Sequence, residues 1–192
     1  MSVATASASD SNRTLRTAAV GAATGFGAAI LGYLATYLAT SSTIENSTAS
    51  QVLEALGQGF STWKVVGWVF MNAHGVVTKF PALFGGTSAV NLIENVDAFS
   101  AVLYVVPVVA LVAAGVLAVV VSGAHSTKAG AIAGASTVLG YLPVALAGIA
   151  LFAITIGDSV ARPDPVTAIL LAGAVYPALV GTLSGVATAA LR

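Results

Sequence analysis

The sequence has no cysteine, and only 7% of its 192 residues are charged. Without cysteine, disulfides, thiol catalysis and cysteine-ligated metals are all excluded. Soluble domains carry roughly 25% Asp, Glu, Lys and Arg because their surface faces water, so this low charge content indicates that most of the surface does not. The formal net charge of zero provides neither a basic stripe nor an acidic tail, and no nucleic-acid partner is expected.

Four long runs in the chain contain no Asp, Glu, Lys, Arg or His. Each is long enough to cross a hydrocarbon core about 30 Å thick, at about 1.5 Å per residue. The first run is too long for a signal peptide, whose apolar core has only about 7 to 15 residues, and is better interpreted as a retained membrane anchor. The sequence therefore predicts an all-α membrane helical bundle with four transmembrane helices, at Thr17–Ala39, Ala98–Val121, Ala129–Ile156 and Val166–Leu191.

The remaining charges orient this bundle. One acidic residue and four basic ones lie in the N-terminal segment, the connection between the second and third spans, and the C-terminus. Six acidic residues and three basic ones lie in the connections that follow the first and the third spans. Lys and Arg are enriched in cytoplasmic loops. We therefore expect a multi-pass protein of the cell membrane with its N-terminus and C-terminus in the cytoplasm. We expect residues 1–12 to be a flexible cytoplasmic tail, residues 13–192 to form a single transmembrane domain, and residues 40–97 to form an external insert. The four basic residues are Arg13, Arg16, Lys128 and Arg192.

Within the insert, Thr62–Phe80 is hydrophobic but also contains two lysines. As a fifth span it would bury charges at about 2.5 to 3.5 kcal/mol each. At 100° per residue its polar side chains share one side, which favours an amphipathic helix at the interface or packed on the bundle. A capping box at Thr48–Gln51 predicts a second short amphipathic helix. Its apolar face would consist of Val52, Leu53 and Leu56.

The most distinctive part of the insert combines the chain's only two tryptophans with an asparagine, a histidine and two lysines. Trp and Lys both favour the lipid headgroup level, so one interpretation is an interfacial anchor. The other is an external recognition surface for a lipid headgroup, pigment or partner protein, because an indole and an ammonium at helical spacing can bind one polar group jointly. This candidate surface, the Trp/Lys segment, consists of Trp63, Lys64, Trp68, Asn72, His74 and Lys79.

The stretch from Thr62 to His74 resembles the T-W-K-x-V-G-W-x-F-x-N-A-H stretch of a family of uncharacterised multi-pass membrane proteins from halophilic archaea. The resemblance includes the Gly85–Gly86 turn and the LGYLP sequence of Leu139–Pro143, and extends over most of the chain from the first span onward. It implies a membrane location and an archaeal source. It supplies no catalytic residues.

Small residues recur at steps of three and four in three of the four predicted spans. Such faces let helix backbones approach closely and supply van der Waals contact where lipid removes the hydrophobic drive. The pattern leaves open whether the partner helix is internal or belongs to another copy. The residues predicted to pack in this way are Gly21, Gly25, Gly32, Gly130, Gly134, Gly173, Gly181 and Gly185.

No motif in the sequence identifies a reaction, a cofactor or a metal site. The predicted spans lack the charged residues or histidine that would mark a proton-coupled pathway, and we expect a non-enzymatic structural or accessory subunit. It would contact membrane lipids and associate through its glycine faces, as a homo-oligomer or within a larger membrane complex. The alternative is a small-solute channel or transporter, with a path lined by hydroxyls and by kinks at Pro107, Pro143 and Pro177. Asn46 begins an Asn-Ser-Thr sequence and is a possible glycosylation site.

Overall fold

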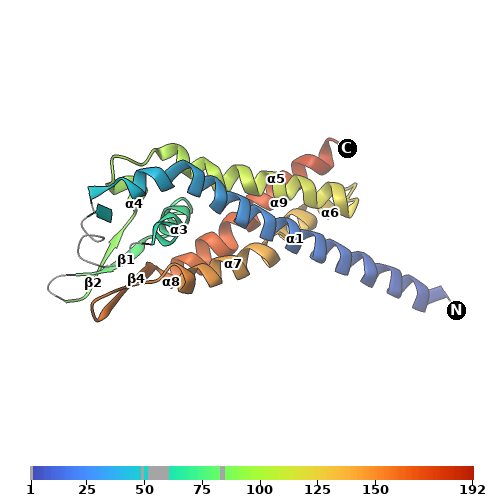
Figure 1. Cartoon of the computed structure of the whole chain (residues 1–192). Helices are drawn as coiled ribbons and strands as arrows, with labels where there is room; N and C mark the ends of the chain where they lie inside the picture. Colours follow the sequence, from blue (N-terminus) through green and yellow to red (C-terminus); the bar gives the residue numbers. More distant parts are fainter. Residues whose placement is uncertain (1, 49, 52–60, 83–84) are drawn as a thin grey trace. The chain divides into compact units, whose positions relative to one another are not determined.

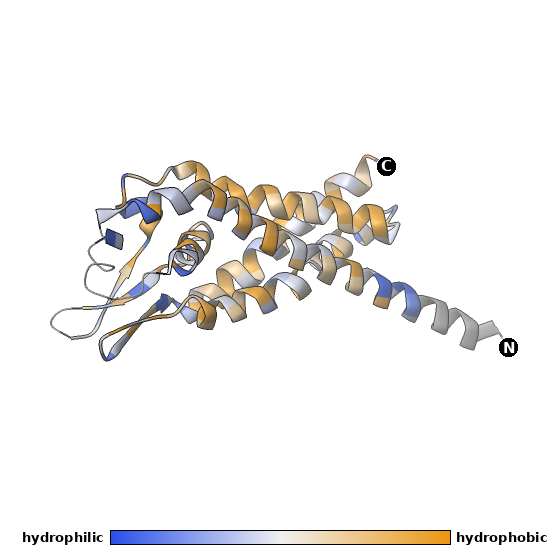
Figure 2. Cartoon of the chain, in the orientation of Figure 1, coloured by the Kyte–Doolittle hydropathy of each residue, from blue (hydrophilic) through white to orange (hydrophobic). Residues whose placement is uncertain are grey.

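The computed structural model describes residues 2–48, 50–51, 61–82 and 85–192 and is mostly helical (Figure 1). It confirms four helices that are long and apolar enough to cross a membrane, which is consistent with a membrane location. Figure 2 shows how hydrophobic residues dominate these helices. The four candidate spans are Ser11–Glu45, Ala101–Ser122, Thr127–Leu151 and Pro165–Ala190.

The first candidate span is part of one long helix, α1, which covers Ser2–Glu45. Residues 2–12 therefore belong to this helix, and whether they form a flexible tail stays a prediction. Extending an existing helix avoids the cost of nucleating a new one, and alanine has the best intrinsic helix propensity. The Ser/Ala-rich composition that suggested a tail is thus compatible with a helix.

The other three candidate spans are each built from more than one helical segment. A 3₁₀ turn leads into α5, a break at Ser136 and Thr137 separates α6 from α7, and π-helical backbone joins α8 to α9. π-helical backbone is rare and mostly limited to single turns, and here it extends over eight residues. The bounds are Ala101–Tyr104 for the 3₁₀ turn η1, Val105–Ser122 for α5, Thr127–Ala135 for α6, Val138–Leu151 for α7, Pro165–Thr167 for α8, Ala168–Val175 for the π-helix η2 and Tyr176–Ala190 for α9.

The chain divides into two compact units. Unit 1 consists of Met1–Ala29, Val108–Val144 and Gly173–Arg192. Its core contains small apolar side chains, among them Ala118 and Ala133, which allow close helix packing. Unit 2 consists of Ile30–Pro107 and Ala145–Ala172 and contains larger side chains.

Unit 2 also contains a small antiparallel sheet, which corrects the all-α expectation. The strand order is β2-β1-β4-β3, so strands from the insert pair with strands from the connection between the third and fourth candidate spans. Lys79 on β1 lies opposite Ala89 on one side and Arg162 on the other. The strands are β1 (Thr78–Pro81), β2 (Thr87–Val90), β3 (Ile154–Ile156) and β4 (Ser159–Pro163).

The segment Thr62–Phe80 does not form one amphipathic helix. Helix α3 covers Thr62–Asn72, and β1 follows after a turn in which Gly75 has a φ of 76°. Eleven residues rise only about 16 Å, too little to cross the hydrocarbon core. Residues 65–72 are buried, so α3 packs inside unit 2 and has no polar face turned to water. A further short helix, α4, covers Leu92–Asn95.

The expected second helix of the insert is described only at its start. The hydroxyl of Ser47, rather than that of Thr48, accepts the backbone N–H of Ser50, at 3.2 Å. The cap therefore lies one residue earlier than the capping box predicted. The apolar face expected at residues 52–56 lies outside the described residues.

Candidate functional site

Two residues of the Trp/Lys segment donate to the carboxyl end of α7. The Nζ of Lys64 lies 2.7 Å from the carbonyl oxygen of Ala153, and the Nε1 of Trp68 lies 2.6 Å from that of Phe152. The last carbonyls of a helix lack partners within the helix, and a cation near this end is favourable. The indole and the ammonium each donate to a different, neighbouring carbonyl, and their joint binding of one external polar group stays a prediction. Both carbonyls belong to the two residues that follow α7.

An aromatic cluster surrounds the same helix end. The ring of Phe152 stacks on Tyr33, with centroids 5.7 Å apart, and meets the ring of Trp63 edge-on at 6.1 Å. The hydroxyl of Tyr33 donates to the carbonyl oxygen of Trp63 at 2.9 Å. A Cβ at Gly67 would collide with the Phe152 ring, so glycine is required for this close approach. Such aromatic pairs contribute about 0.5 to 1.5 kcal/mol each beyond the area they bury.

Asn72 is fully buried and joins three elements of the insert. Its Nδ2 donates to the carbonyl oxygen of Val76 at 2.6 Å and to the hydroxyl of Thr78 at 3.3 Å. Its Oδ1 accepts the backbone N–H of Leu92 at 2.8 Å. The amide thereby links the end of α3 to β1 and to the start of α4.

His74 is buried and hydrogen-bonded to its own helix turn. Its Nδ1 lies 2.8 Å from the carbonyl oxygen of Phe70. Because a carbonyl oxygen can only accept, Nδ1 carries the proton. The imidazole also meets the Phe70 ring edge-on, with centroids 4.9 Å apart. Burial lowers the pKa of His74 to about 4, although the bond to the Phe70 carbonyl partly opposes this shift. The imidazole is therefore neutral at pH 7.

This buried histidine should make the protein less stable in mild acid. Because the pKa of His74 is about 4 in the folded chain and that of an unperturbed histidine is 6.5, the unfolded state binds more protons between these pH values. The free energy of unfolding should fall as the pH drops from about 6.5 to about 4, by up to about 3 kcal/mol. Detergent-micelle unfolding at several pH values measures this fall. His74→Gln should flatten the curve and the exposed His125→Gln should not; equal curves for all three proteins would contradict the assignment.

Lys79 and Asp164 connect the sheet to the start of the fourth candidate span. The Lys79 Nζ forms an ion pair with Oδ1 of Asp164, whose Oδ2 accepts the backbone N–H of Thr167 at 3.1 Å as the N-cap of α8. Burial raises the pKa of Asp164, but hydrogen bonds from Lys79 and Thr167 outweigh burial and hold that pKa below its ordinary value. The carboxylate stays ionised and keeps both partners at neutral pH.

The Trp/Lys segment is therefore not a continuous external surface. Trp68, Asn72 and His74 are buried, whereas Trp63 and the side chain of Lys79 are each 43% exposed. Their polar groups find acceptors inside the chain, which removes the reason for them to face outward. Whether the exposed part binds a partner stays a prediction. Asn46, the possible glycosylation site, is exposed.

The predicted glycine faces pack inside unit 1. A Cβ at Gly25 would collide with the backbone of Thr137, and one at Gly21 with Ser136. Gly130 and Gly134 of α6 face two glycines of α9 in the same way, and Gly32 and Gly173 are buried. Six of the eight glycines thus contact a helix or turn of their own chain, so for these six the packing partner is internal and not another copy. Those facing α6 from α9 are Gly181 and Gly185.

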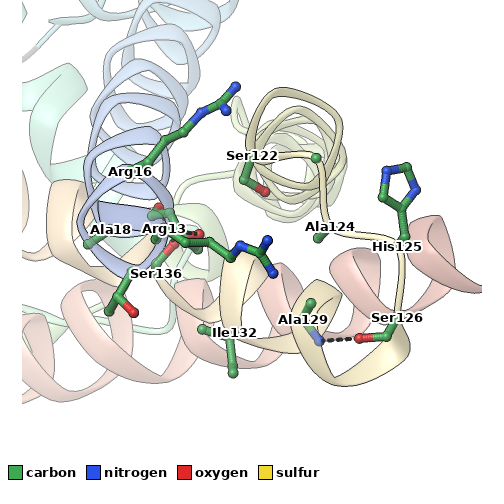
Figure 3. Close-up of a pocket in the computed structure, with 13 residues that line it drawn as sticks. Arg13, Arg16, Ala18, Ser122, Ala124, His125, Ser126, Ala129, Ile132 and Ser136 are labelled. Carbon is green, nitrogen blue, oxygen red and sulfur yellow. Dashed lines mark hydrogen bonds between the residues drawn. The ribbon is translucent and has the colours of Figure 1, made fainter. Parts of the chain in front are cut away.

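Unit 1 also contains an open cavity of about 810 Å³ (Figure 3). Arg13 and Arg16 reach it from α1, and His125 and Ser126 line it from the connection between α5 and α6. One guanidinium nitrogen of Arg16 donates to the carbonyl oxygen of Val121 at 3.0 Å. The remaining lining residues are Thr14, Thr17, Ala18, Ser122, Gly123, Ala124, Ala129, Ile132 and Ser136.

Comparison with known proteins places the chain in a family. The model of DUF7978, described as a family of unknown function, matches residues 1–192. The chain belongs to this family. No curated protein and no solved structure matches it. DUF7978 covers both the Trp/Lys segment and the cavity of unit 1, and its description assigns neither a role.

Sequence reasoning found the donors of this DUF7978 chain but not their acceptors. Phe152 and Ala153 lie 84 and 89 residues from Trp68 and Lys64, and a backbone carbonyl carries no signature in the sequence. Asp164 was visible only as a charge in a loop. The cavity was not predicted, because Arg13 and Arg16 were used only to infer which side of the membrane the N-terminus lies on.

Proposed function

We propose that this protein is a membrane-embedded, non-enzymatic structural or accessory subunit that holds a rigid insert at the outer surface of the cell membrane. The observation that carries this proposal is the internal use of the Trp/Lys segment. Lys64 and Trp68 fix α3 to the end of α7, and Asn72 fixes it to β1 and α4. Because the polar groups of these side chains are bonded within the chain, they favour a rigid structural role over a catalytic one.

The proposed topology places both termini in the cytoplasm. Unit 1 has four Arg and Lys residues and one acidic residue, whereas unit 2 has three basic residues and six acidic ones, which agrees with the positive-inside rule. Pairing of β1 with β4 supports the same arrangement, since both connections must then share one side of the membrane. The halophilic archaeal source rests on the motif resemblance alone.

The route of association differs from the one the glycines suggested. Six of the eight glycines already contact helices of their own chain, so association with another subunit must use other surfaces. We propose that partners contact the exposed part of the insert, which includes Trp63. The exposed apolar side chains of α5 and α9 would then face lipid.

Purification from native membranes in mild detergent tests this role. We expect a particle heavier than one 18.9 kDa chain after the detergent mass is subtracted, with either further copies or a second protein. Trp63→Ala should weaken the association, whereas Leu38→Ala, which replaces an exposed side chain of α1, should not. A strictly monomeric particle from native membranes would contradict a subunit role.

The alternative, a small-solute channel or transporter, has less support. Hydroxyls expected to line a path are bonded to their own helices: Thr24 donates to Gly21, Ser136 to Ala133 and Thr137 to Gly134, at 2.7 to 3.2 Å. Solute flux into proteoliposomes that depends on the protein would overturn the subunit proposal in favour of transport.

A further inference from the structure

The cavity of unit 1 combines fixed positive charge with hydroxyl groups. Arg13 and Arg16 lie on neighbouring turns of α1, and both line it. Arg16 donates one of its five N–H groups to the Val121 carbonyl. That bond fixes the guanidinium beside the end of α5 and leaves further N–H donors for a bound group. Ser126 lines the same space, and its hydroxyl oxygen accepts the backbone N–H of Ala129, so its own O–H is left to donate.

The surroundings of the cavity contain little negative charge. Among the lining residues that the structure describes none is acidic, and the one acidic residue in the sequence of unit 1 is Asp10. Lys128 and Arg192 add positive charge to the same unit without lining the cavity. The potential there favours an anion, and guanidinium forks match the oxygens of phosphate in geometry as well as charge.

The rest of the lining is apolar. Ala18, Ala124 and Ile132 contribute to the same walls as the arginines. In the sequence, Arg16 immediately precedes the first uncharged run, which begins at Thr17. In a membrane-spanning chain this position lies near the headgroups, where basic pockets between helices bind anionic lipids. A phospholipid offers both parts that this lining suits, an anionic phosphate and an adjoining apolar region.

We propose that this cavity binds the phosphate of an anionic phospholipid from the cytoplasmic leaflet. Arg13 and Arg16 contact the phosphate oxygens, and the hydroxyl of Ser126 donates to one of them. The proposal rests on the membrane location and topology given above and does not depend on the subunit role. Mass measurement of the particle tests that role separately.

The test uses the full chain in detergent micelles and native mass spectrometry. The probes are dioleoyl phosphatidylglycerol, its zwitterionic counterpart dioleoyl phosphatidylcholine, and water-soluble glycerol phosphate. We expect retention of phosphatidylglycerol, with Arg13→Gln weakening binding by about 10- to 100-fold, as the loss of a charged hydrogen bond predicts. Lys128→Gln is the matched control, because it removes one charge from the same unit outside the cavity. A general surface attraction accounts for about fivefold per charge.

Three outcomes would overturn the proposal. Equal effects of Arg13→Gln and Lys128→Gln would show a diffuse charge attraction without a built site. Equal retention of phosphatidylcholine and phosphatidylglycerol would show that anionic charge is not recognised. Tight binding of glycerol phosphate without lipid would assign the cavity to a soluble phosphate ester. Arg13 is exposed, so its replacement leaves the fold intact, and an unchanged unfolding midpoint checks this.

Discussion

Replacing Gly134 by alanine should lower the free energy of unfolding by about 3 kcal/mol, at the upper end of the cost of overpacking a well-packed core. The added Cβ would collide with the backbone carbonyl of Gly181, which cannot move without displacing α9. The helices would have to separate, and the van der Waals contact that holds them together in lipid would be lost. Titration of the micelle-bound chain with a denaturing detergent, followed by circular dichroism, measures the loss.

A matched pair on α1 provides the control. Gly25→Ala adds a Cβ against the backbone of Thr137, whereas Gly27→Ala adds the same atom into open space. Gly25→Ala should therefore destabilise the chain. Gly27→Ala should leave stability unchanged or raise it by up to about 1 kcal/mol, through helix propensity. Similar effects of the two substitutions would show that packing does not explain the glycine spacing.

The same variants separate internal packing from association. Because Gly25 and Gly134 contact their own chain, their substitution should lower stability by the same amount at every protein concentration. If these glycines joined copies instead, the variants would dissociate an oligomer, and the effect would depend on concentration. A variant monomer as stable as the unaltered monomer would contradict the internal assignment.

The helices could be predicted from the sequence because their signal is local. A run without charge is enough to predict a candidate span, and α5 and α9 lie where such runs were found. The ends of the spans were less accurate. Residues 154–156 continue the apolar run of the third span, and a short apolar run does not distinguish strand from helix. They form β3, and a turn at Gly157, with a φ of 59°, leads into β4.

The sheet and the site depend on contacts that the sequence does not record. Strand β1 has four residues, two of them Lys79 and Pro81, and gains its partners from β2 and from β4 far along the chain. Burial of α3 depends in the same way on acceptors in the α7 to β3 connection. The polar residues of α3 suggested an exposed face because the sequence gives no indication of internal acceptors. The sequence identified which side chains could donate hydrogen bonds, but it did not identify the distant carbonyls and strands that they contact.

Replacing Trp68 by alanine should have a comparably large effect, because it removes both a buried ring and a helix-end contact. Trp68 is 5% exposed, packs edge-on against Phe80 at 5.1 Å, and donates to the Phe152 carbonyl. Truncating a buried tryptophan to alanine costs about 3 to 5 kcal/mol. Trp68→Phe keeps a ring but leaves that carbonyl without the indole N–H, and should cost about 1 to 3 kcal/mol.

Trp63→Ala is the matched control, since the same residue type on the same helix is 43% exposed. Its loss should cost about 1 kcal/mol, mainly from the edge-on contact with Phe152. Each alanine variant retains one tryptophan, so fluorescence reports on each site separately. The protein that keeps Trp68 should emit at shorter wavelengths than the one that keeps Trp63, because its indole is shielded from water. If Trp68→Ala proved as mild as Trp63→Ala, the segment would not anchor α3, and an outward-facing recognition role for Trp68 would regain support.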